Sequence, residues 1–86
     1  MAKYDPLFRY LCTAGDEPIE MTFDEIEQLV GALPAAATAR RDWWSNDHTM
    51  RAAQSRAWLD AGRQVDEVDR TQRRVRFSAA RWRRSS

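Results

Sequence analysis

The side chains of this 86-residue sequence that are best suited to chemistry are its arginines, which supply thirteen of the fourteen basic residues. A guanidinium group is planar and permanently charged, and its fork of donors matches phosphate oxygens and the edge of guanine. Seven of these arginines fall between residues 70 and 84. This concentration favours an anionic partner, and nucleic acid is the first candidate.

The sequence offers little for catalysis. His48 and Cys12 are the only residues of their types, so the set of ligands that usually holds zinc is missing. Cys12 follows Leu11 on an apolar helix, where we expect a buried and unreactive thiol. The acids of residues 20–27 include one helix-capping glutamate and otherwise suit a solvated face. We therefore expect a binding protein that is not an enzyme and needs no metal or cofactor.

A helix predicted over residues 35–46 carries polar side chains typical of a helix that reads DNA. They are of the types that contact bases and phosphates when a helix enters the major groove. They are Thr38, Arg40, Arg41, Ser45 and Asn46. We expect Arg40, Arg41 and Asn46 to make the main contacts. The alternative is an alanine-rich surface helix whose charges serve solubility.

Further candidate contacts lie at the start of the next helix and on the last predicted hairpin. The helix start attracts anions through its dipole, and an arginine-faced hairpin suits a phosphate backbone. The candidates are His48, Arg51, Gln54 and Ser55 near the helix start, Arg74 and Arg76 on the hairpin, and Arg81, Arg83 and Arg84 in the tail. The alternative for the hairpin is that charge protects an edge strand from pairing.

The net charge of +1 conceals a division along the chain. Residues 1–34 hold two basic and seven acidic residues, and residues 35–86 hold twelve basic and six acidic residues. The first part therefore carries −5 and the second +6. Such a division indicates a nucleic acid or an acidic protein as partner, although a solvated arginine-rich surface also fits.

The elements that position these residues begin with two well-signalled helices. Asp5 and Pro6 favour a helix start, and an apolar stripe then recurs at helical spacing from Tyr4 to Leu11. A second helix begins at a capping box, in which Thr22 is the N-cap and Glu25 the third helical residue. It ends at Gly31. Before it, Ile19 and Met21 alternate with polar residues and predict a short strand.

The remaining elements are a third helix over residues 35–44, a fourth helix and two strands. Thr49 is the expected cap of the fourth helix, which runs to about Ala61 and ends at Gly62. Residues 65–68 predict a weak strand, and Val75 and Phe77 alternate with arginines in a stronger one.

Adjacent tryptophans cannot share one face of a helix, so we expect Trp43 in the core. Trp44 either joins it, which we favour, or faces a partner.

This order of elements predicts an α+β domain with a C-terminal β-hairpin. It is the order of a winged helix-turn-helix with one added helix, and the last two strands would form the wing. We expect one domain over residues 3–78 and a basic tail over residues 79–86. The sequence contains neither an apolar run long enough to span a bilayer nor a secretion signal. We expect a cytoplasmic protein.

Several of these stretches together resemble a family of small, uncharacterised bacterial proteins and domains. The pattern comprises Lys3-Tyr4-Asp5-Pro6-Leu7, Thr22-Phe23 with Ile26-Glu27, Leu33-Pro34, Trp43-Trp44-Ser45-Asn46 and Ala57-Trp58-Leu59-Asp60-Ala61-Gly62. In that family a hydrophobic residue, often Trp, follows the glycine, whereas this chain has Arg63. The resemblance implies a shared fold and no particular activity.

The sequence as a whole therefore predicts a DNA-binding domain with a regulatory or accessory role, acting on double-stranded DNA. A homodimer would suit a protein that reads two half-sites. The alternative is a protein-interaction module, for example a phage- or defence-linked inhibitor or an accessory domain. Salt dependence separates the two, because binding to phosphates weakens steeply as salt rises.

Overall fold

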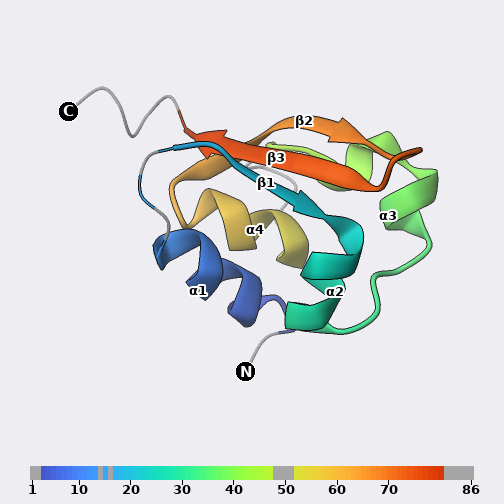
Figure 1. The fold of residues 1–86 in the computed structure, drawn as a ribbon, viewed down its shortest axis with the longest axis horizontal. Coiled ribbons are helices and arrows are strands. Elements are labelled where there is room, and N and C mark those ends of the chain that lie inside the picture. Colours follow the sequence, from blue (N-terminus) through green and yellow to red (C-terminus); the bar gives the residue numbers. More distant parts are fainter. Residues whose placement is uncertain (1–2, 14, 16, 48–51, 81–86) are drawn as a thin grey trace.

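A three-stranded antiparallel sheet forms the upper layer of the molecule (Figure 1). The computed structural model describes residues 3–13, 15, 17–47 and 52–80. Its strands are β1 (Ile19–Thr22), β2 (Arg63–Asp69) and β3 (Arg74–Ala79), in the spatial order β1-β3-β2. The predicted α+β architecture with a C-terminal hairpin is confirmed, and β3 lies at the centre of the sheet although it follows both of its neighbours in sequence.

The register of the strands sorts apolar and charged side chains onto opposite faces. Met21 of β1 stands opposite Val75 of β3, and Ile19 stands opposite Phe77. Met21, Val75 and Phe77 are buried. The intervening residues point the other way because side chains alternate along a strand. The outer face of the sheet is therefore charged, with Arg76 opposite Glu20.

Three helices lie against the inner face of the sheet (Figure 1). They are α1 (Asp5–Thr13), α2 (Phe23–Val30) and α4 (Ala53–Leu59). The predicted apolar stripe of α1 is confirmed, since Leu7 and Leu11 are buried. Among the described residues, no helix is long and apolar enough to cross a membrane.

The capping box that begins α2 is also confirmed. The Glu25 amide donates to Thr22 Oγ1 at 3.0 Å, and the Thr22 amide donates to Glu25 Oε1 at 2.8 Å. Gly31 ends the helix at a φ of 85°, where a side chain would be strained, and its amide donates to the Glu27 carbonyl. Both ends of this helix are therefore set by local sequence.

The prediction of one helix over residues 35–46 is wrong. The structure has a single α-turn, α3 (Ala36–Ala39), followed by a 3₁₀ segment, η1 (Arg41–Trp44). Arg40 separates them with an extended backbone at φ −126° and ψ 121°. The break turns the chain so that both tryptophans of η1 can pack against the core. Burial of these large side chains therefore overrides the helix preference of the alanine run.

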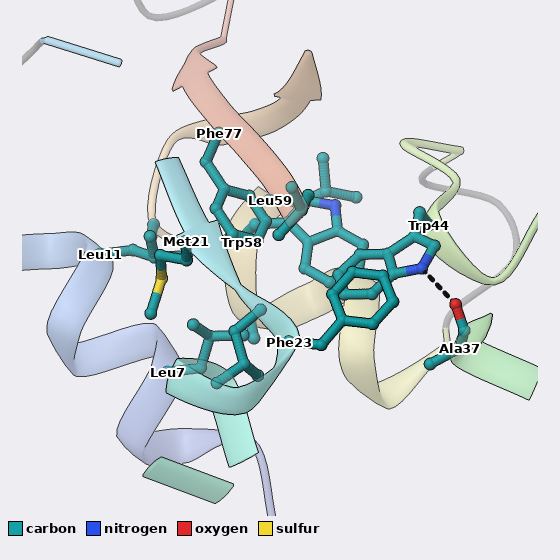
Figure 2. Packing of buried hydrophobic residues seen from close by; sticks show 13 residues of the cluster. Leu7, Leu11, Met21, Phe23, Ala37, Trp44, Trp58, Leu59 and Phe77 are labelled. Carbon is teal, nitrogen blue, oxygen red and sulfur yellow. Dashed lines mark hydrogen bonds between the residues drawn. The ribbon is translucent and has the colours of Figure 1, made fainter. Parts of the chain in front are cut away.

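Aromatic rings form the middle of the core, as Figure 2 shows. The Trp44 ring stacks on Phe23 at 5.0 Å and on Trp58 at 5.7 Å between ring centroids. Its Nε1 donates to the Ala37 carbonyl at 2.8 Å, which ties α3 to the core. Trp44 is buried, whereas Trp43 is half-buried and packs edge-on against it. Trp44 thus belongs to the core as favoured, but the deeper tryptophan is not Trp43 as expected.

Two further expectations about single residues are corrected. Cys12 is exposed and is not a core side chain. It lies next to Leu11, and one residue corresponds to a rotation of about 100° around a helix, so it leaves the buried stripe. The fourth helix begins at Ala53 with Ala52 as its N-cap. The expected cap, Thr49, lies outside the described residues.

Candidate nucleic-acid interface

The structure brings two of the predicted arginine groups together at one end of the molecule. A depression of about 530 Å³ lies between α3 and the turn of the β2–β3 hairpin. Thr38 and Arg41 line it from one side, and Arg70 and Thr71 line it from the other. We call these four residues, with the neighbouring Arg40, the α3–hairpin face. Figure 1 shows α3 beside this turn.

Arg70 joins the two sides of the α3–hairpin face. Its guanidinium donates to the Ala39 carbonyl at 3.0 Å and to the Thr38 carbonyl at 3.4 Å. Carbonyls at the C-terminal end of a helix lack partners within the helix, and a cation there interacts favourably with the negative end of the helix dipole. The hairpin turn is therefore held against the end of α3 by a bond between segments about thirty residues apart in sequence.

Arg40 and Arg41 point into solvent on this face. Arg40 pairs with Asp42 at 3.1 Å, and both side chains are more than half exposed. Arg41 is exposed and makes no ion pair within the part of the chain that the structure describes. Two acids, Glu67 and Asp69, also line the depression. The α3–hairpin face therefore offers free guanidinium donors next to carboxylates.

The arginines of the outer sheet face are paired within the chain. Arg74 lies 3.6 Å from Glu20 on β1. Arg76 lies 3.3 Å from Asp66 and 3.1 Å from Glu67 on β2. The predicted arginine face of the hairpin is thus flanked on both sides by acids, and its charge is balanced before any ligand arrives.

Ion pairs within the fold neutralise part of the charge division along the sequence. Arg73 pairs with Asp24 at 3.2 Å and Glu27 at 3.5 Å on α2, and its guanidinium lies over the Phe23 ring. Basic residues of the second half therefore meet acids of the first. The described ranges hold ten basic and twelve acidic residues, a net charge of −2, although the whole sequence carries +1.

The Asn46 side chain is hydrogen-bonded within the protein and is not free to contact a DNA base as predicted. Its Nδ2 donates to the Val65 carbonyl at 2.9 Å, and its Oδ1 accepts from the Val65 amide at 2.7 Å. Ser45 Oγ accepts from the Asp47 amide at 3.1 Å. Both residues shape the segment that follows η1, and neither lines the depression of the α3–hairpin face.

The predicted contacts at the start of α4 also bond inside the chain. Ser55, one of these candidate contacts, is buried, and its hydroxyl donates to the Ala52 carbonyl at 3.0 Å. Gln54 Nε2 donates to the Trp43 carbonyl at 3.3 Å. His48 and Arg51 lie outside the described residues, as do the tail arginines 81, 83 and 84.

Arg63 is the residue whose role sequence reasoning missed. It is fully buried at the start of β2. Its guanidinium donates to the carbonyls of Leu11 at 3.3 Å, Glu17 at 3.0 Å and Phe77 at 3.4 Å, and also to that of Gly15. The hydrophobic residue that the resembling family has after Gly62 was the available signal, because it indicates a buried position.

A second hollow, of about 300 Å³, lies between α1 and α4. Phe8, Ala53 and Ala57 supply its apolar lining, and Asp5, Arg56 and Asp60 supply charged groups. Tyr4 also lines it, and burial raises the pKa of the Tyr4 hydroxyl above its usual value of 10.0. In the described ranges, no three His, Cys, Asp or Glu side chains are grouped to hold a metal ion.

Comparisons with known proteins assign the chain to a family but to no activity. Neither a curated protein nor a solved structure matches it at a significant level. One family model matches residues 4–80, which is nearly all of the chain and contains every element of the fold. The chain therefore belongs to the family described as Domain of unknown function (DUF7662).

Proposed function

We propose that this domain binds double-stranded DNA through the α3–hairpin face. The observation that carries the proposal is that Arg41 and Arg70 line one depression, with Arg40 next to Arg41 in sequence and with Arg41 unpaired among the described residues. The order of the elements, with a hairpin after the last helix and β3 at the centre of the sheet, supports a winged-helix-like arrangement as part of this proposal. Binding without catalysis, in the cytoplasm, is part of this proposal.

The proposed contacts are to the DNA backbone and not to base edges. A turn of four residues rises only about 6 Å, so α3 is too short to lie along a major groove. Arg41 and Arg70 can instead hold phosphate oxygens from the two sides of the depression, as arginines do in most protein–DNA contacts. This mode gives affinity with little sequence preference.

Charge sets the expected strength of this binding. The described residues carry a net charge of −2, so a phosphate backbone meets few unpaired cations there. The remaining basic residues are Arg51, Arg81, Arg83 and Arg84. We propose that they add electrostatic affinity that does not depend on sequence. Each phosphate contact contributes about 0.9 to the slope of log K against log salt.

The test is a fluorescence-anisotropy titration against a mixed-sequence duplex at two salt concentrations. We expect binding that weakens steeply with salt, and a clear loss of affinity in Arg40→Ala/Arg41→Ala. The control is Arg9→Ala, which removes an exposed arginine from α1. The tail is assessed separately with Arg81→Ala/Arg83→Ala/Arg84→Ala. Equal affinities of the control and the double variant would remove the α3–hairpin face from the proposal.

A protein partner is the second candidate, and two observations favour it. The sheet arginines are already paired with carboxylates, and the hollow between α1 and α4 combines an apolar lining with charged groups. Such a surface suits an amphipathic protein segment. Binding to a protein would survive high salt and would be weakened by Phe8→Glu, which leaves the α3–hairpin face unchanged.

A further inference from the structure

The Asn46 side chain stands where the backbone of an additional strand would lie. In a β-strand the N–H and C=O groups of one residue point to the same edge. Both groups of Val65 bond to Asn46, at 2.7 and 2.9 Å, so this edge is the one that faces away from β3. A carboxamide can present an N–H donor and a C=O acceptor side by side, as one residue of a β-strand does along its edge. Asn46 therefore satisfies the outward backbone groups of Val65 as a residue of a fourth strand would.

The adjoining part of β2 has other properties of a protected edge. β2 is an outer strand of the sheet, and its register shifts between Val65 and Glu67, which is a β-bulge. Bulges and charged residues are known means of preventing sheets from pairing edge to edge. Asp66 and Glu67 at this bulge are held by Arg76. Among the described residues, however, the Asn46 side chain is the one that bonds directly to the outward backbone groups of Val65.

Space for a further strand exists beside this edge. A groove of about 680 Å³ runs between η1 and β2 and is lined by Arg41, Asn46 and residues 65–68. Val68 stands opposite Val75, two residues from the Phe77 partner of Val65. Phe77 and Val75 are two residues apart on β3, and the bulge adds one residue to β2 between their partners. Val68 therefore directs its backbone N–H and C=O to the same edge as Val65. The edge thus presents two apolar residues whose backbone groups face outward.

We propose that Asn46 prevents β2 from pairing with β2 of a second copy of this chain. Two identical antiparallel edges are self-complementary, since a two-fold axis brings each outward N–H opposite an outward C=O. Removal of the carboxamide leaves both backbone groups of Val65 without partners, and a second β2 can supply them. The edge adjoins the α3–hairpin face, since Arg41, Glu67 and Val68 line both hollows. The proposal rests on the bonds of Asn46, however, and its test uses the protein without nucleic acid, so its outcome does not depend on DNA binding.

The test compares Asn46→Ala with Gln54→Ala, which also removes a side-chain amide bonded to a backbone carbonyl but away from the strand edge. Sedimentation velocity over a wide concentration range reports the assembly, and near-ultraviolet circular dichroism confirms the fold. We expect Asn46→Ala to shift from monomer to dimer as concentration rises. The wild type and Gln54→Ala should show no dimer that involves β2. Hydrogen exchange should show the Val68 amide becoming protected in the Asn46→Ala dimer only.

A second variant keeps the proposal testable where Asn46→Ala does not fold. Asn46→Asp retains the acceptor for the Val65 amide but loses the donor to its carbonyl, so we expect a folded protein with weaker dimerisation. Three results would overturn the proposal. They are a folded variant that stays monomeric at every concentration, a dimer in which the Val68 amide remains unprotected, and a wild-type dimer whose Val68 amide is protected.

Discussion

The outer sheet face and the α3–hairpin face use the same residue type in opposite ways. On the sheet, Arg74 pairs with Glu20 of β1, and Arg76 pairs with Asp66 and Glu67 of β2. At the α3–hairpin face, Arg70 bonds to backbone carbonyls and Arg41 extends into solvent. The number of arginines in a segment therefore does not locate a binding surface. What matters is whether the fold pairs a guanidinium group with a carboxylate, as it does for Arg76 and, among the described residues, does not for Arg41.

This difference has an energetic side. An exposed ion pair contributes only about 0–1 kcal/mol to stability, so the sheet arginines are not held strongly. A phosphate that took Arg76 would nevertheless leave Asp66 and Glu67 next to it without their cation, and these carboxylates would repel it. Arg41 meets no such competition from an ion pair among the described residues.

The largest expected effect is a loss of stability on replacing Arg63, a fully buried arginine that bonds to backbone carbonyls. Arg63→Met should lower the free energy of unfolding by about 3–5 kcal/mol, because several buried carbonyls lose their donor at once. Urea denaturation followed by tryptophan fluorescence measures it. Arg56→Met, which removes an exposed pair with Asp60, should cost less than about 0.5 kcal/mol. Similar losses in the two variants would contradict the internal role of Arg63.

The next largest effect is expected at Trp44, through which the core supports the α3–hairpin face; both stability and DNA affinity should change there. Trp44→Phe removes the bond to the Ala37 carbonyl and should cost about 1–3 kcal/mol. Because this bond ties α3 to the core, DNA affinity should fall as well, whereas Trp43→Phe should change both quantities less. Thermal unfolding and anisotropy measure the two quantities. A stable Trp44→Phe variant with full affinity would show that α3 does not depend on this anchor.

The comparison of the two arginine faces can be tested directly by binding. Arg41→Ala should reduce the slope of log K against log salt by about 1 for each phosphate that the variant no longer binds, because Arg41 is unpaired among the described residues. Arg74→Ala/Arg76→Ala should leave this slope nearly unchanged, since those guanidinium groups are already paired. Anisotropy at several salt concentrations gives both slopes. The opposite result would move the proposed interface to the sheet.

The smallest expected effect is a change of stability at alkaline pH. Burial raises the pKa of Tyr4 in the folded protein above the ordinary value of 10.0. The unfolded chain therefore ionises first, so stability that is complete below pH 10 should decrease as pH rises through the raised folded pKa. Urea denaturation at a series of alkaline pH values measures it. The loss of stability at alkaline pH should be smaller in Tyr4→Phe than in the wild type. An equal loss in the two proteins would show that other groups cause it.

The parts of the fold that sequence reasoning predicted are those determined by neighbouring residues. The capping box of Thr22 and Glu25 places the start of α2 correctly, and the alternation around Val75 and Phe77 identifies β3. The hairpin turn lacks the usual glycine signal. It forms with Arg73 at a φ of 57° and with the Gln72 amide bonded to Asp69 Oδ1.

The parts that sequence reasoning missed depend on interactions between distant residues. The break at Arg40 follows from packing of Trp44 against Trp58, which the local alanine run does not reveal. The use of Asn46 depends on Val65, nineteen residues away. Of the candidate site, Arg40 and Arg41 are exposed, and Arg40 is paired with Asp42. That Arg41 and Arg70 line one depression required the structure.

The central position of β3 has a consequence for the order in which this domain can fold during synthesis. β1 and β2 share no hydrogen bonds, because both pair only with β3. A growing chain that has emerged from the ribosome as far as Asp69 therefore holds two strands without a partner for either. Closing the sheet joins residues such as Ile19 and Phe77 that are far apart in sequence, and this slows folding. Until then, the apolar residues of both strands remain exposed to other chains in the cell.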